Sequence, residues 1–119
     1  MPILEIVSQT APQDLNSFIA RLSKVFAEAI DRPEAYCLVT FQKVDALSFA
    51  GNQEPGFLVK VGSIGNVDND ANASLTNKVS EVLLEELKTS NDRGYFWFTD
   101  LPASDVGFKG TTFANLWKQ

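Results

Sequence analysis

Histidine is absent from the 119-residue sequence, and its absence excludes several common kinds of active site. Without an imidazole there is no Ser-His-Asp triad, no Cys-His pair and no histidine-ligated metal. There is one cysteine, Cys37, so an intramolecular disulfide and a cluster of thiolate ligands are also excluded. Because Cys37 lies in an apolar run, we interpret it as a buried, inert thiol. No metal site is predicted.

Positive charge and long apolar runs are also scarce. Ten lysines and arginines stand against 15 aspartates and glutamates, for a net charge of −5. Nucleic acids and anionic membrane surfaces bind basic patches, so neither is expected as a partner. No stretch is long and apolar enough to span a membrane, and the residues after Met1 do not read as a signal peptide. We expect a cytoplasmic protein with one domain over residues 1–119.

Apolar spacing predicts the order strand, helix, strand, repeated once. The predicted strands are residues 2–8, 36–42, 56–63 and 95–99, with loops at 45–55 and 65–73. One helix has apolar residues at helical spacing from Leu15 to Ile30, and a second has its buried face from Leu75 to Leu87. We therefore predict an α+β fold, a two-layer arrangement of two β-α-β repeats. Its four-stranded mixed sheet would carry both helices on one face.

The other face of this sheet is predicted to need a partner. The strands are rich in aromatic and β-branched residues, and a sheet face of such residues is larger than soluble monomers usually leave in water. The sheet edges also need partners. We therefore expect the chain to form an oligomer through its sheet face.

Pro2 follows the initiator methionine directly. A small residue at this position normally allows Met1 to be removed, which would leave a free prolyl secondary amine at the start of the first strand. An α-amino group has a pKa of about 7.7–8.0, and burial and a nearby cation would both lower it. A base with a pKa close to the working pH is effective in general acid–base catalysis. Pro2 is therefore a candidate catalytic base.

Several short motifs, in this order and spacing, resemble the macrophage migration inhibitory factor family, which includes D-dopachrome tautomerase. They are Pro2, Arg32-Pro33 with Tyr36, Phe49-Ala50-Gly51 with Glu54-Pro55, Ser63-Ile64-Gly65, Asp92-Arg93 with Tyr95, Val106-Gly107-Phe108 and Thr112-Phe113-Ala114. The resemblance implies a homotrimer whose three sheets surround a channel. It also implies a keto–enol tautomerase, an isomerase without a cofactor, that acts on small phenylpyruvate-like or dopachrome-like substrates.

The resemblance also implies roles for individual residues. Pro2 would transfer the proton, and Arg32, where the family usually has lysine, would hold the substrate carboxylate and depress the pKa of Pro2. The backbone N–H of Ile64 would contact the substrate, and Tyr95 would come from the neighbouring subunit. Trp97, where well-known members have asparagine, would reshape the pocket mouth. The remaining wall would consist of Tyr36, Val106, Phe108 and Phe113.

Structural alternatives exist for several of these residues. Arg32 could cap the C-terminus of the first helix, where cations are favoured. Tyr95 could be ordinary strand packing, and Phe108 and Phe113 could belong to a core or an interface whatever the activity. Trp117, near the end of the sequence, could be a packing anchor or part of a disordered end.

Two other functions remain open from the sequence. The first is a cytokine-like signalling protein with a vestigial pocket, which would be secreted without a signal peptide and would bind a cell-surface receptor. The second is another enzyme of the wider N-terminal-proline superfamily, such as a dehalogenase. Such enzymes typically add charged groups that activate water, and Arg32 is the one such group with a predicted position.

Overall fold

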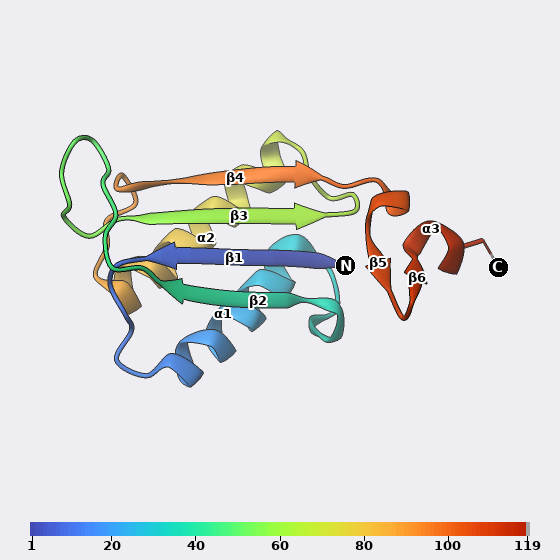
Figure 1. The fold of residues 1–119 in the computed structure, drawn as a ribbon, viewed down its shortest axis with the longest axis horizontal. Helices are drawn as coiled ribbons and strands as arrows, with labels where there is room; N and C mark the ends of the chain where they lie inside the picture. Colours follow the sequence, from blue (N-terminus) through green and yellow to red (C-terminus); the bar gives the residue numbers. More distant parts are fainter. Residues whose placement is uncertain (119) are drawn as a thin grey trace.

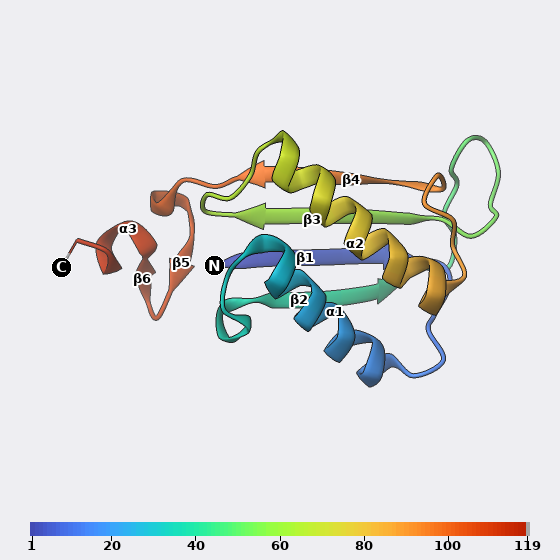
Figure 2. The same cartoon turned by 180° about the vertical axis from the view of Figure 1, so that it is seen from behind.

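Two helices cross one face of a four-stranded sheet in the computed structural model of the chain, which describes residues 1–118 (Figures 1 and 2). The strands are β1 (Pro2–Ser8), β2 (Leu38–Lys43), β3 (Phe57–Ser63) and β4 (Gly94–Asp100), in the sheet order β2-β1-β3-β4. β1 runs parallel to β2 and β3 parallel to β4, whereas β1 and β3 are antiparallel. The predicted mixed sheet of two β-α-β repeats, with both helices on one face, is confirmed.

The helices are α1 (Leu15–Ile30) and α2 (Asn69–Leu87). α1 has the predicted bounds, and the side chain of Asp14 caps it by accepting a hydrogen bond from the Ser17 N–H. α2 begins earlier than predicted, because the carboxylate of Asp68 accepts the Ala71 N–H at 2.8 Å and starts the helix inside the stretch expected to be a loop. A polar first turn hides such a start from an analysis of apolar spacing.

The hydrophobic core lies between the sheet and the helices. Phe18, Leu22 and Phe26 of α1 are fully buried against residues of the two central strands, and Val79 and Leu83 of α2 are buried beside them. Burial of this apolar surface provides the main driving force for folding.

The open face of the sheet is more mixed than the sequence analysis predicted. Along β4 the side chains alternate, so Phe96 and Phe98 pack against the core while Tyr95 and Trp97 stay exposed. Glu5 lies opposite Lys60 in the pairing of β1 with β3, so charged and apolar groups share this face.

The rest of the chain beyond β4 forms a small unit at the end of the sheet where the chain begins (Figure 1). It contains the 3-10 turn η2 (Ala103–Asp105), the short strands β5 (Gly107–Phe108) and β6 (Thr111–Thr112), and α3 (Phe113–Leu116). A second 3-10 turn, η1 (Glu34–Tyr36), precedes β2 at the same end, so β2 starts two residues later than predicted.

Replacing Leu83 with alanine should lower the free energy of unfolding by about 2–5 kcal/mol, because this side chain is fully buried. Its neighbour Leu84 is 53% exposed, and Leu84→Ala should change that free energy by no more than about 0.5 kcal/mol. Urea unfolding at one fixed protein concentration measures both variants. Equal losses would contradict the placement of α2.

Candidate active site

The first residue of the central strand β1 lies at the end of the sheet where β3 and β4 finish. Pro2 pairs with Ser63, the last residue of β3, and Ser63 pairs with Asp100, the last residue of β4. Pro2 is buried. The Ser63 side chain is also buried, and its hydroxyl has no hydrogen-bond partner among the described residues. A buried, sparsely hydrogen-bonded surrounding is one that disfavours charge.

An apolar cavity of about 270 Å³ opens beside Pro2. Four of the predicted wall residues line it together with Pro2, namely Tyr36, Val106, Phe108 and Phe113. Cys37 and Leu38 contribute to the same wall, and within residues 1–118 no acidic or basic side chain lines it. The structure therefore brings the predicted base and the predicted apolar wall together.

A second cavity of about 380 Å³ adjoins the first and contains Arg32. Met1, Tyr36, Phe108 and Phe113 line both cavities. Arg32 lines only the second of the two, so the predicted base and the predicted carboxylate-binding residue lie in adjoining cavities that share Met1. Lys109 and Trp117 also line the second cavity, although neither was among the predicted site residues. Lys109 directly follows Phe108, a predicted wall residue, and this adjacency in the sequence could have indicated Lys109 as a further site residue.

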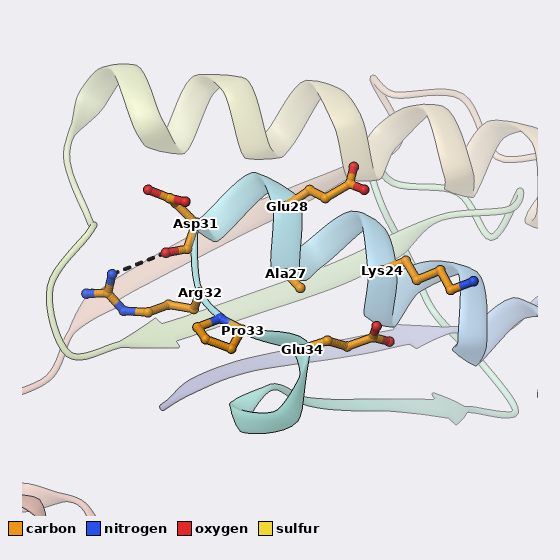
Figure 3. Close-up of a pocket in the computed structure, with 7 residues that line it drawn as sticks. All are labelled: Lys24, Ala27, Glu28, Asp31, Arg32, Pro33 and Glu34. Atoms are coloured by element: carbon orange, nitrogen blue, oxygen red, sulfur yellow. Dashed lines mark hydrogen bonds between the residues drawn. The ribbon is translucent and has the colours of Figure 1, made fainter.

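Arg32 also makes the helix-capping contact that was the structural alternative for it. Its guanidinium donates a hydrogen bond to the carbonyl of Asp31, which caps the C-terminus of α1 in a left-handed conformation (Figure 3). The guanidinium lies beside Gly65, where a β-carbon would be 3.7 Å from it. The Arg32 side chain therefore lies between the end of α1 and the turn that follows β3.

A larger depression of about 480 Å³ lies on the other side of Arg32, along the end of α1 (Figure 3). Glu28, Asp31 and Glu34 line it with Lys24 and Arg32. The three carboxylates outnumber the two cations, which disfavours an acidic substrate, and Pro2 does not line this depression. The two smaller cavities therefore form the better candidate site, despite their size.

The electrostatics of the site act on the amino terminus. Burial lowers the pKa of the Met1 amino group, and the positive charge of Arg32 lowers it further, whereas Cys37 acts in the opposite direction. Burial raises the pKa of the Cys37 thiol. The positive charge of the amino terminus lowers it in part, and the negative charge of Glu34 raises it further. The surroundings thus favour an uncharged amine, and the raised thiol pKa agrees with an inert Cys37.

Three predicted site residues do not line either cavity within one chain. Tyr95 pairs with Leu58 and so lies roughly 15 Å along the strands from the end that holds Pro2. Trp97 lies on the open face, where the Lys60 ammonium is 5.9 Å from its ring centre. Ile64 directly follows β3 and is partly buried. Tyr95 and Trp97 are 71% and 62% exposed, so both are free to contact another chain.

A separate network holds Tyr95 in place. The rings of Phe49 and Tyr95 pack in an edge-type arrangement with their centres 5.2 Å apart, and the Arg93 guanidinium lies 5.2 Å from the Phe49 ring centre. Arg93 donates hydrogen bonds to the backbone carbonyls of Phe49, Glu54 and Pro55. The loop at 45–55 is thereby fixed to the start of β4.

Comparison with known proteins identifies the family. The sequence model described as "Macrophage migration inhibitory factor (MIF)" matches residues 1–114. The chain belongs to this family. A macrophage migration inhibitory factor homolog of Brugia malayi is 32% identical over 114 residues, which cover 95% of this chain and 99% of the relative.

Solved structures of the macrophage migration inhibitory factor family share the fold. The homologue from Prochlorococcus marinus has a TM-score of 0.88 and 33% identity, covering 93% of this chain and 98% of its own. The structure from Trichinella spiralis has a TM-score of 0.84 and 26% identity, covering 92% and 98%. The chain is therefore a tautomerase-fold protein. Within residues 1–118, no helix is long and apolar enough to cross a membrane.

Cys37 should react slowly with alkylating reagents. Because its side chain is partly buried and its thiol pKa is raised, we expect alkylation by iodoacetamide at pH 7.5 to be at least about tenfold slower than in the urea-unfolded chain. Cys37 is the only cysteine, so intact mass assigns every thiol adduct. Equal rates in the folded and unfolded chain would contradict the assigned environment.

Proposed function

We propose that the mature chain is a cofactor-independent keto–enol tautomerase of aromatic 2-keto acids, with the secondary amine of Pro2 as general base. The supporting observation is the position of Pro2, which is buried in an apolar cavity that adjoins the cavity of Arg32. Residues 1–119 would act as one such domain. Membership of the macrophage migration inhibitory factor family favours this function.

The proposed reaction requires that Met1 is removed. While Met1 is attached, the nitrogen of Pro2 is an amide without a basic lone pair, and Met1 occupies space at both cavities. Removal would expose the amine and join the cavities. Because the Met1 amine is already made less basic by burial and Arg32, we expect the same two causes to lower the pKa of the Pro2 amine.

The proton transfer balances within the substrate. The neutral amine takes a proton from the carbon between the ring and the carbonyl, and the electron pair of that C–H bond forms a carbon–carbon double bond. The carbonyl oxygen becomes an enolate and receives the proton from the prolinium. The reverse sequence converts enol to keto acid. Arg32 would hold the carboxylate through two hydrogen bonds, and the apolar wall would enclose the ring.

We further propose that the active protein is a homotrimer in which Tyr95 and Trp97 reach the neighbouring chain. Their exposure supports this arrangement, as do Leu38 and Tyr36, which are 53% and 62% exposed near the candidate site. Ile64 would contribute its backbone N–H to the substrate, next to Gly65 and Arg32.

Pro2→Gly should lower kcat/KM for phenylpyruvate by at least about 100-fold, because the secondary amine is lost as general base. Pro12→Gly, at a proline ahead of α1, serves as the matched control and should stay within about twofold of the parent. Intact mass must show the loss of Met1, and sedimentation must show the same assembly for all three proteins. Unchanged turnover in the Pro2 variant would overturn the assignment.

Arg32→Gln should shift the pH profile of kcat/KM to higher pH. Arg32 disfavours protonation of the neighbouring amine, so its removal raises the pKa of the base, and the neutral form then requires a higher pH. Loss of the carboxylate contact should also lower kcat/KM by about 10- to 100-fold. Arg21→Gln removes the same charge from a surface ion pair with Glu85 and should leave the profile in place. A shift to lower pH with Arg32→Gln would contradict the proposal.

A further inference from the structure

The cavity beside Arg32 is unusually positive for an acidic chain. Among the described residues its lining includes two cations, Arg32 and Lys109, and no acidic side chain. The chain as a whole has 15 acidic residues against 10 basic ones, and the neighbouring depression along α1 has three carboxylates beside Lys24 and Arg32. The cavity of Pro2 has no charged side chain among the described residues that line it. The joined site would therefore have one apolar chamber and one cationic chamber.

Lys109 is held over this chamber by a tight turn. Lys109 and Gly110 connect β5 to β6 with φ values of 53° and 79°, which is the two-residue turn with both central φ positive that matches the twist of a hairpin. Its ammonium lies 5.5 Å from the centre of the Phe108 ring, and Phe108 lines both chambers. Lys109 is thus a cation with a defined position at the chamber.

Trp117 forms the far wall of the same chamber. Its ring packs on Phe113 at 5.3 Å, and Phe113 stacks on Phe108 at 5.5 Å with nearly parallel planes. The Thr112 hydroxyl accepts the Asn115 N–H and caps the start of α3. This contact holds the short helix that leads into Trp117. Trp117 lies beyond the residues that the family model matches, and 58% of it is exposed. An indole offers a hydrogen-bond donor and no acceptor.

We propose that the cationic chamber binds the acidic end of a ligand that carries two negative groups there, with Arg32 holding one and Lys109 the other. This inference rests on the proposed function in that the ring of the ligand lies in the apolar chamber beside Pro2. A single carboxylate needs one cation, and Arg32 supplies it. Lys109 and the indole N–H of Trp117 remain as donors for a second group. The substrate class is accordingly an aromatic 2-keto acid with a further carboxylate near the keto end.

The test compares two unreactive acids by calorimetry on the chain that begins at Pro2. Benzylmalonate and 3-phenylpropanoate share the ring and carbon chain and differ by one carboxylate at the acidic end. We expect the parent to bind benzylmalonate at least about fivefold more tightly, and 0.5 M NaCl to reduce this preference by screening. Lys109→Gln should abolish the preference while changing the Kd of 3-phenylpropanoate less than about twofold.

Two controls separate the possible outcomes. Lys78→Gln removes the same charge from the exposed side of α2 and should keep the preference. Trp117→Phe should weaken benzylmalonate binding more than 3-phenylpropanoate binding, because it removes the indole N–H and retains an aromatic ring. An equal affinity of the parent for both acids, a preference that survives Lys109→Gln, or no binding of either acid would each overturn the inference.

The same measurements distinguish this inference from the proposed function. Turnover of phenylpyruvate without a preference for benzylmalonate would contradict the inference about the cationic chamber and leave the proposed tautomerase function standing. A preference that depends on Lys109 in a protein without phenylpyruvate turnover would remove the tautomerase and leave a binding site for dianionic aromatic acids.

Discussion

The structure depends on the antiparallel pairing of β1 with β3. A strand that started the chain at a sheet edge would have its first residue exposed to water. Here β1 lies between β2 and β3, and its first residue is buried opposite the last residue of β3. The ends of β3 and β4, the turn η1 and the small C-terminal unit then meet around this point. One hydrogen-bonded register thus determines where an amino-terminal nitrogen can lie and which side chains surround it.

This arrangement separates apolar and charged surroundings over a short distance. The apolar chamber makes a charged amine costly, and the guanidinium at its border adds to that cost without entering the chamber. Arg32 is itself fixed by its hydrogen bond to the helix end. Capping and ligand binding are therefore compatible roles for Arg32, because its guanidinium bonds the carbonyl of the capping residue Asp31 and also lies beside Gly65 in the turn after β3.

Much of the fold could be predicted from the sequence because its signals are local. The apolar spacing of α1 and the turn-forming residues around each strand predicted the element order, and short motifs predicted the family. The start of α2 was missed because a polar capping residue, Asp68, determines it. The mixed composition of the open face was missed because the sequence does not show which of the two alternating sets of strand residues faces the helices. The second chamber is lined by residues from distant parts of the chain, such as Met1, Arg32 and Trp117, and no local pattern contains that arrangement.

The loop at 45–55 shows a different kind of constraint. All hydrogen bonds that Arg93 donates to it go to main-chain carbonyl oxygens, and Gln9 adds a hydrogen bond to another carbonyl, that of Gln53. These acceptors are present whatever side chains the loop carries. Besides Phe49, which packs on Tyr95, the path depends on the Asn52 side chain, which accepts the Glu54 N–H, and on Gly51, whose φ is 77°. Mutational drift at the other positions of this segment would therefore alter the outer surface of the protein without moving the tyrosine that the loop supports.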